Sequence, residues 1–294
     1  MTGAGGQGVV FLNPDSGGDR EPTDQAVTEA MESCGLAVET LDDPADMPDR
    51  ARVALEAGRS PIGVAGGDGT IRCVAEVLAG TGVPMVVVPA GTRNHFAREL
   101  GLETLDHTVA AVRAGHVRRV SVGQVNDRTF VNNASIGMYP DMVRRRERQE
   151  SRRSKALAGV YAAADVLRQG RPVEVCVDGT DLQAWLVFVG NGRYGDGFID
   201  LVDRDSLESD VLDVRVVRAD RRLARARVAA ALLAGRLRSS PLIVTREAAE
   251  LPLGVEGRRI DVALDGEVMT LEAPLTCCVR PGALSVVAPP EPVG

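Results

Sequence analysis

The first third of the chain alternates short apolar runs with longer amphipathic ones. Residues 61–65 are apolar and bounded by proline and glycine, which is typical of a buried parallel strand. Apolar side chains then recur at helical spacing from Ile71 to Leu78, and Gly80 ends the segment. Similar runs predict further strands over 9–12, 36–41 and 85–88, and helices over 24–33, 50–57, 94–100 and 104–114. This alternation predicts a parallel sheet covered on both faces, with ligands bound at the carboxyl ends of its strands.

From about Val120 the pattern changes to many closely spaced strand-like runs, which predict an antiparallel sandwich. Two helical segments interrupt them, near 155–168 and 222–234. The runs cover residues 120–125, 130–136, 173–177, 184–190, 212–217, 242–245, 259–264, 268–271 and 276–279. The expected fold is an α/β domain with a parallel sheet over residues 1–120 and a second, β-sandwich domain over 121–282. The active site is expected in the cleft between the two domains.

Composition and charge narrow the set of possible functions. Of the 294 residues, 44% are hydrophobic and 26% charged, as in ordinary globular proteins. The formal net charge of −7 and the aromatic content of 3% argue against a nucleic-acid partner, which needs basic and stacking surfaces. The sequence shows no membrane-spanning apolar run and no signal-peptide pattern, and its five scattered cysteines suggest reduced thiols. A cytoplasmic location is therefore expected.

Three glycine-containing turns follow predicted strands. They read Asn-Pro-Asp-Ser-Gly-Gly at 13–18, Gly-Gly-Asp-Gly-Thr at 66–70 and Pro-Ala-Gly-Thr-Arg-Asn at 89–94. Glycine lets main-chain N–H groups approach phosphate, and a helix N-terminus favours negative charge. Asp68 is the unusual member, because a carboxylate repels phosphates unless Mg²⁺ or a hydrogen-bond network intervenes. Three such turns at one edge of a sheet predict that the α/β domain binds a nucleotide.

A fourth turn leads to a family resemblance. The segment Leu-Asp-Gly-Glu at 264–267 follows an alternating run, and Asp-Gly there by itself indicates a β-hairpin. Taken with Asn-Pro-x-Ser-Gly at 13–17, the 66–70 turn and Gly-Thr-x-Asn-x-x-Ala-x-x-Leu at 91–100, it resembles the diacylglycerol kinase catalytic family. That family includes bacterial lipid kinases and sphingosine kinases. The resemblance spans nearly the whole chain, with the motifs in the family's order and spacing.

The resemblance implies ATP and Mg²⁺ as cofactors and the return of residues 283–294 to the first domain. It places the family's general base at Asp265, where a carboxylate can take the proton of an attacking hydroxyl, and Glu267 near the phosphates or their metal. A role in a helix cap or an Asx turn is the alternative for Asn13, Ser16, Thr40, Thr70 and Thr92, and for Asn94 a helix N-cap is at least as good an interpretation. The residues that correspond to the family's nucleotide-binding motifs are Asn13, Ser16, Gly17, Thr40, Gly66, Gly67, Asp68, Gly69, Thr70, Gly91, Thr92 and Asn94.

Three departures from the family's motifs concern one group of carboxylates. His95, Ser121 and Ser209 stand where family members carry aspartates. In bacterial members these form one network with Asp68 around a structural Mg²⁺. Because Mg²⁺ prefers charged oxygen ligands, their joint loss predicts an absent or altered metal site. His95 paired with Asp68 is one form of this hypothesis, and Asp210 is the candidate replacement ligand.

A basic stretch over residues 144–155 stands out in this acidic chain. A solvated face is the favoured interpretation, because two glutamates dilute the arginines. A docking patch for anionic lipid surfaces is the alternative.

The leading hypothesis is a lipid kinase, peripheral to a membrane, that phosphorylates a hydroxyl of a diacylglycerol-like or sphingosine-like lipid. NAD kinase is the nearest enzyme alternative because it shares the Gly-Gly-Asp-Gly-Thr turn, although its Thr-Pro-Thr-Gly-Ser signature is not found in this sequence. A catalytically weak lipid- or nucleotide-binding protein is the third hypothesis. Formation of a homodimer through an edge strand of the sandwich is compatible with each of them.

Overall fold

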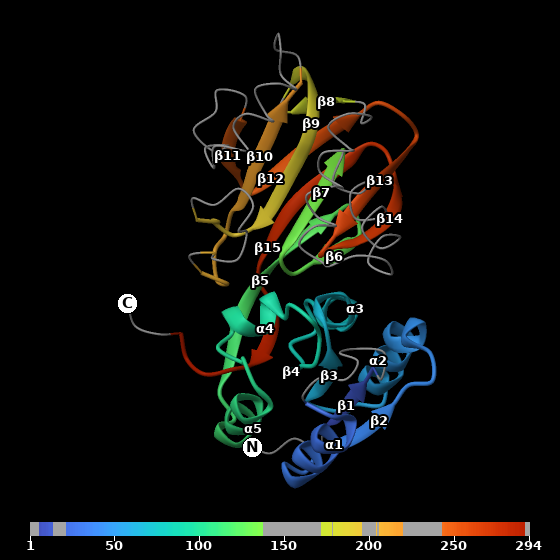
Figure 1. Ribbon diagram of the computed structural model, residues 1–294, viewed down its shortest axis with the longest axis vertical. Helices are drawn as coiled ribbons and strands as arrows, with labels where there is room; N and C mark the ends of the chain where they lie inside the picture. Colours follow the sequence, from blue (N-terminus) through green and yellow to red (C-terminus); the bar gives the residue numbers. More distant parts are fainter. Residues whose placement is uncertain are drawn as a thin grey trace, which may run out of the picture. The chain divides into compact units, whose positions relative to one another are not determined.

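The computed structural model describes residues 6–13, 22–137, 172–177, 179–195, 204, 206–219 and 243–291. The chain forms two compact units (Figure 1). The first draws on residues up to 122, residues 207–209 and residues from 280 onward, and the second on 123–206 and 210–279. The expected limits at 120 and 282 lie within three residues of these, but the short segment 207–209 is an addition to the first unit.

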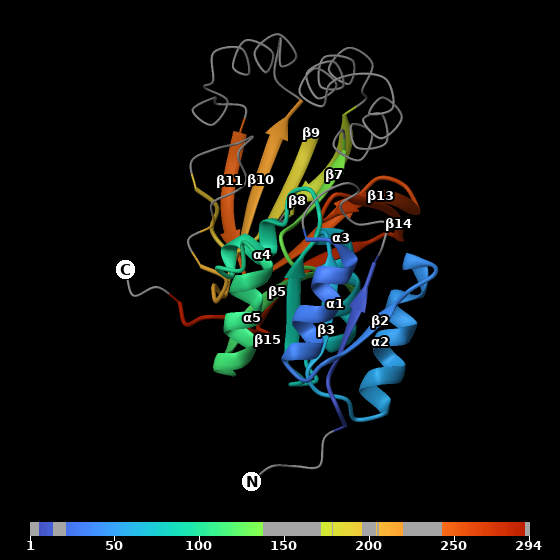
Figure 2. The same ribbon diagram turned by 60° about the horizontal axis from the view of Figure 1, so that its bottom comes forward.

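The first unit contains a parallel sheet, which is partly visible behind its helices in Figure 2. Its strands are β1 (Val9–Leu12), β2 (Ala37–Thr40), β3 (Ile62–Gly66) and β4 (Met85–Pro89). They stand in the order β4-β3-β1-β2, and each neighbouring pair is parallel. Strands β1, β3 and β4 are buried along their whole length, as expected for a sheet covered on both faces. The predicted strands are confirmed, with ends shifted by one residue at most.

Helices connect these strands and pack in two pairs, α1 with α5 and α2 with α3. They are α1 (Asp24–Ser33), η1 (Pro44–Asp46), α2 (Met47–Glu56), α3 (Asp68–Leu78), α4 (His95–Glu99) and α5 (Leu105–Ala114). Helix α1 leads from β1 to β2, whereas α3 leads from β3 to β4 in the opposite direction across the sheet. The carboxyl ends of β1 and β3 therefore form a topological switch point, where open α/β sheets bind ligands.

Strands β5 (Val117–Val125) and β15 (Leu275–Val287) begin in one unit and end in the other. At the end of β15, Val286 pairs in parallel with Met85 of β4. One residue beyond the strand, the N–H of Ala288 donates to the carbonyl of His116. Residues 283–291 thus lie in the first unit, where the family resemblance places the end of the chain.

The second unit consists of antiparallel strands. Strands β14, β13, β7, β9, β8, β12 and β15 are neighbours in that order, and β10 joins β9 to β11. The strands are β6 (Arg128–Phe130), β7 (Asn133–Gly137), β8 (Val173–Val177), β9 (Thr180–Asn191), β10 (Leu212–Arg218), β11 (Ile243–Ala248), β12 (Glu250–Val255), β13 (Arg259–Leu264) and β14 (Glu267–Glu272).

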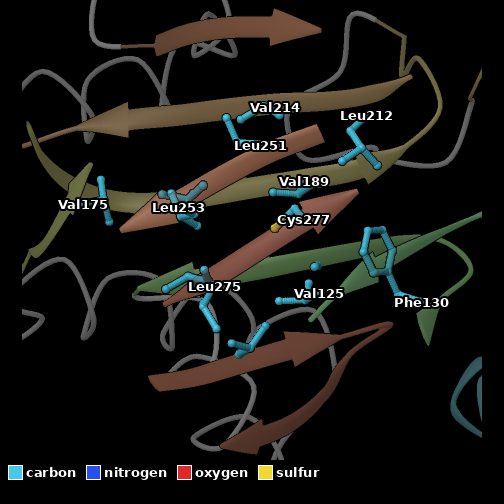
Figure 3. Packing of buried hydrophobic residues seen from close by; sticks show 14 of the residues in the cluster. Val125, Phe130, Val175, Val189, Leu212, Val214, Leu251, Leu253, Leu275 and Cys277 are labelled. Carbon is cyan, nitrogen blue, oxygen red and sulfur yellow. The ribbon is translucent and has the colours of Figure 1, made fainter. Parts of the chain in front are cut away.

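One apolar cluster holds the second unit together, and Figure 3 shows part of it. Alternate residues of several strands point into it, so that Val187 and Val189 of β9 meet Val214 and Val216 of β10 and the side chain of Cys277. This is the period-two burial of a sheet with one face in the core. The predicted second, β-rich domain is confirmed.

Some sequence-based expectations differ from the structure or lie outside its described residues. The predicted strand 130–136 is two strands, because β6 ends at 130 and β7 begins at 133. Strand β12 was not predicted. The helices expected near 155–168 and 222–234 and the basic stretch 144–155 lie outside the described residues. Among the helices that the structure describes, none has the length and apolar character needed to cross a bilayer.

Candidate functional site

The switch point is bridged by two of the predicted nucleotide-binding residues. Asn13 directly follows β1 and is 8% exposed, while Thr70 lies in the first turn of α3. The Nδ2 of Asn13 donates to the Oγ1 of Thr70 at 3.1 Å. The main chain of Asn13 also donates to the carbonyl of Ala65 in β3, at 3.2 Å. The two strand ends that flank the switch point are therefore held in fixed register.

The turns after β3 and β4 touch each other through glycine. A Cβ added at Gly91 would overlap the Cα of Gly67, and it would lie only 2.8 Å from Oδ1 of Asn94. At Gly66, an added Cβ would come within 2.7 Å of Cβ of Thr70. These positions exclude side chains, so the two turns present main chain at the carboxyl edge of the sheet. Such a surface beside the first turn of α3 suits an anion.

The carboxylate of Asp68 faces the start of α4. Its Oδ2 accepts the N–H of His95 and its Oδ1 the N–H of Phe96, both at 3.1 Å. Asp68 thereby satisfies two N–H groups in the first turn of α4, and positive main-chain dipoles offset its charge. This is a hydrogen-bond network of the kind expected for a carboxylate in this glycine turn. The expected pairing of His95 with Asp68 occurs through the main chain of His95 and not through its imidazole.

Asn94 closes the turn after β4. Its Oδ1 accepts the N–H of Gly91 and its Nδ2 donates to the carbonyl of Gly91, both at 2.9 Å, and its φ is +51°. The alternative interpretation of Asn94 as a helix N-cap is confirmed for its position. Asn94 occupies the N-cap position of α4, but its side chain makes no capping hydrogen bond. Thr92, at the outer part of the turn, is exposed.

The remaining nucleotide-binding candidates are less closely connected. Thr40 is the exposed last residue of β2, and Gly69 lies in the first turn of α3. Ser16 and Gly17 lie outside the described residues. The structure thus gathers Asn13, the 66–70 turn and the 91–94 turn into one region of the first unit, with Thr40 at the end of the next strand from β1.

Asp265 belongs to the second unit, in the two-residue turn between β13 and β14. Asp265 and Gly266 have φ values of +50° and +90°, the signature of a type I′ hairpin, so the hairpin interpretation is confirmed. The Asp265 carboxylate nevertheless reaches beyond its own hairpin. Oδ2 accepts the N–H of Val131 at 2.8 Å, and Oδ1 accepts those of Asn132 and Asn133 at 2.7 and 3.0 Å.

Residues 131–133, hereafter the clamped turn, are also held through their carbonyl groups. The carbonyl of Val131 accepts from Nδ2 of Asn191 at 3.0 Å and from Nη1 of Arg204 at 2.8 Å. The carbonyl of residue 132 accepts from the hydroxyl of Tyr194 and from the N–H of Asn191, at 2.8 and 2.9 Å. The carbonyl of residue 133 accepts the N–H of Asp265 at 2.9 Å. Every main-chain polar group of this turn has a partner.

Glu267, the other predicted catalytic residue, begins β14 opposite Leu264 and is exposed. Hydrogen bonds place Asp265 at the clamped turn, whereas Glu267 follows it on the strand that leaves the hairpin.

The three positions that depart from the family's aspartates, and Asp210, lie among the described residues. The described residues contain no group of three or more histidine, cysteine, aspartate or glutamate side chains suited to a metal ion. The Oγ of Ser121 accepts the N–H of Gly282 at 3.3 Å. The Nδ1 of His95 and the Oγ of Ser209 are buried and have no hydrogen-bond partner among the described residues. Asp210, the candidate replacement ligand, is exposed.

The sequence analysis did not identify the residues that hold the clamped turn, namely Asn132, Asn191, Tyr194 and Arg204. The Gly-Asn-Gly segment at 190–192 was the available signal. A Cβ added at Gly190 would come within 2.5 Å of the Tyr194 ring, so this glycine makes room for the tyrosine whose hydroxyl reaches the turn. Long-range hydrogen bonds of this kind leave no periodic pattern in the sequence.

The structure defines a class of protein: a doubly wound α/β unit with glycine turns at its switch point, followed by an antiparallel β unit. Family models agree with both halves. Residues 7–125 match the diacylglycerol kinase catalytic domain, and residues 134–288 match the YegS C-terminal NAD kinase beta sandwich-like domain. The chain belongs to the family of diacylglycerol kinases and YegS-like lipid kinases.

Individual relatives cover most of the chain. A protein named "Probable lipid kinase YegS-like" from Pseudomonas fluorescens is 30% identical over 91% of this chain and 91% of its own length. A diacylglycerol kinase from Mycobacterium tuberculosis is 27% identical over 80% of this chain and 79% of its own length. The crystal structure of a diacylglycerol kinase from Bacillus anthracis shares the fold, with a TM-score of 0.69, 19% identity and 98% coverage of both chains.

Proposed function

We propose that this chain is an ATP-dependent lipid kinase, which transfers the γ-phosphoryl group of ATP to a hydroxyl of a diacylglycerol-like or sphingosine-like lipid. The observation that carries the proposal is the close approach of Gly67 to Gly91 beside the switch point, which leaves no room for a side chain at position 91. The names of the relatives, a probable lipid kinase and a diacylglycerol kinase, support a lipid as the acceptor.

In this proposal the first unit binds the nucleotide. The glycine turns at 66–70 and 91–94 donate main-chain N–H groups to the phosphates, and Thr70 and Thr92 add hydroxyls. Asn13 acts by fixing Thr70, and Asn94 by closing its turn. Mg²⁺ bound with ATP offsets the charge of the phosphates.

The acceptor side of the reaction is assigned to Asp265, with Glu267 near the phosphates. The lipid oxygen forms a bond to the γ-phosphorus, while the bond from that phosphorus to the bridging oxygen breaks and its electron pair leaves with ADP. The hydroxyl proton passes to the Asp265 carboxylate and then to solvent. Hydrogen bonds from three N–H groups hold the Asp265 carboxylate in a fixed orientation. A loose phosphoryl-transfer transition state needs little base strength and much orientation, which fits this arrangement.

A lipid acceptor also implies a peripheral position at a membrane surface, with the basic stretch 144–155 as the candidate contact. Binding to anionic vesicles that weakens with salt, and is lost when the arginines of this stretch become serine, would support that assignment. Binding that is unchanged in this variant would leave the stretch as a solvated face.

A γ-phosphate transfer assay tests the function. The protein is incubated with Mg²⁺, radiolabelled ATP and a total lipid extract, beside Asp265→Asn, and NAD and water are offered as acceptors in parallel. We expect a labelled, chloroform-soluble product from the wild type and at least a hundredfold less from Asp265→Asn. Label on NAD instead would establish the NAD-kinase alternative. No product with any acceptor would identify a binding protein without kinase activity.

A further inference from the structure

The clamped turn, which leads from β6 into β7, is held at every one of its main-chain polar groups. Three N–H groups converge on one carboxylate at 2.7–3.0 Å, and the three carbonyls accept from Asn191, Arg204, Tyr194 and Asp265. Hydrogen bonds to a charged group are stronger than those between neutral groups. Such a concentration around three residues fixes the direction in which their side chains leave the main chain.

Of the three side chains in this turn, two are committed to the interior. Val131 is fully buried, and Asn132 is 6% exposed and accepts from Nη2 of Arg204 at 3.3 Å. The amide of Asn133 differs, because it is partly exposed and makes no hydrogen bond within the described part of the chain. An oriented amide with unused donors and acceptor, next to a fixed carboxylate, can bind a polar group from outside.

The side chain of Asn133 points away from the apolar core. Its neighbours in β7, Ala134 and Ile136, point into the apolar cluster, so Asn133 lies on the opposite face. Across the β7–β9 pair it stands opposite Gly190, where the Tyr194 ring occupies the position that a side chain would take.

We propose that Asn133 positions the acceptor hydroxyl of the lipid, and that Asp265 orients Asn133 through the main chain of the clamped turn. This inference rests on the proposed lipid-kinase function and adds a residue to it. Nδ2 of Asn133 donates to the oxygen of the acceptor hydroxyl, which turns the O–H proton toward the Asp265 carboxylate. Asp265 therefore has two tasks, receiving the proton and holding the group that aims it. A hydroxyl-bearing headgroup is the chemical class that this pair recognises.

The test is a double-mutant cycle on lipid phosphorylation, with Asn133→Ala, Asp265→Asn and the double variant assayed in detergent micelles containing diacylglycerol. We expect Asn133→Ala to lower kcat/KM for the lipid at least tenfold, as for a lost hydrogen bond to a reacting group. The KM for ATP and the melting temperature should stay unchanged, because the amide makes no hydrogen bond within the described residues. The kcat/KM of the double variant for the lipid should be no more than about threefold below that of Asp265→Asn, since Asp265 orients Asn133.

Gln183→Ala is the matched control, because it removes an exposed amide from β9 in the same unit and should leave every parameter at the wild-type value. Should Asp265→Asn fail to fold, Asn133→Asp replaces it, and its extra charge beside Asp265 should lower lipid kcat/KM more than Asn133→Ala does. Wild-type lipid kinetics in Asn133→Ala, or fully additive losses in the cycle, would overturn this inference alone. A wild-type protein without lipid product would overturn the proposed function as well.

Discussion

At the scale of single residues, the candidate nucleotide site depends on two glycines, which have no side chains, as much as on its polar residues. Gly67 and Gly91 come from turns that follow different strands, yet their main chains touch. The carboxylate of Asp68 and the amide of Asn94 then fasten the second turn from two sides. Main-chain N–H groups preorganised in this way lose little entropy when an anion binds.

Replacing Gly91 with alanine should damage this site directly. The new Cβ would overlap Gly67 and approach Oδ1 of Asn94 at 2.8 Å, so the two turns must separate. We expect ATP affinity, measured by titration calorimetry, to fall at least about tenfold, which corresponds to roughly 1.4 kcal/mol. Gly6→Ala is the control, because a Cβ there meets only ordinary contacts of 3.6 Å or more. Equal ATP affinity in the Gly91 and Gly6 variants would contradict the assignment of this turn to phosphate.

A second prediction at this scale concerns pH. Burial, with a smaller contribution from neighbouring Cys278, raises the pKa of Cys277 from 9.0 to about 12. Above pH 9 the unfolded chain releases this proton while the folded chain keeps it, so the thiol's contribution to stability is complete below pH 9 and declines from 9 to 12. The decline is about 1.4 kcal/mol per pH unit. Urea unfolding of wild type and Cys277→Val between pH 8 and 10.5 measures this decline. If the free energies of unfolding of the two proteins change in parallel with pH, the pKa of the thiol is not raised in the folded state.

At the scale of elements, hydrophobic periodicity was sufficient for the first unit and insufficient for part of the second. Fully apolar runs such as 85–88 have few alternatives to a buried parallel strand. Strand β12 was not predicted, and it contains Pro252, a residue that is unfavourable within a strand. In the structure Leu251 and Leu253 point into the core, and the proline between them is exposed. The local sequence pattern does not show that pairing with two neighbouring strands, β15 and β8, keeps this segment extended.

The candidate site, like the fold, could be predicted from the sequence only in part. The glycine turns were predictable because close main-chain approach requires glycine locally, whatever the rest of the chain does. The partners of their polar residues were not, since Asp68 caps a helix 27 residues away and Asp265 binds a turn more than 130 residues earlier. Motif spacing therefore located the carboxylates, and only the fold shows which N–H groups they hold.

At the scale of the whole molecule, the first unit is assembled from three separate stretches of chain. Arg118 of β5 connects them. Its side chain is 4% exposed, its Nε lies 3.2 Å from Oε1 of Glu208, and its Nη2 lies 3.2 Å from Oε1 of Glu291. Nearby, the N–H of Ser121 donates to the carbonyl of Leu207 at 2.8 Å. One buried guanidinium thus joins the central and terminal stretches to the first.

Replacing Arg118 with methionine, which keeps the apolar stem but removes the charge, should loosen both attached stretches without unfolding the sheet. Both glutamates are more than 40% exposed and can hydrate, so we expect a modest loss of about 1–2 kcal/mol in urea unfolding. Hydrogen exchange should quicken at the amides of Ser121 and Ala288, which bond to Leu207 and His116, while the buried amides of β3 keep their wild-type rates. Arg113→Met, at an exposed position of α5, is the matched control. Unchanged exchange at both reporter amides would mean that main-chain pairing alone, as between Val286 and Met85, holds the three stretches together.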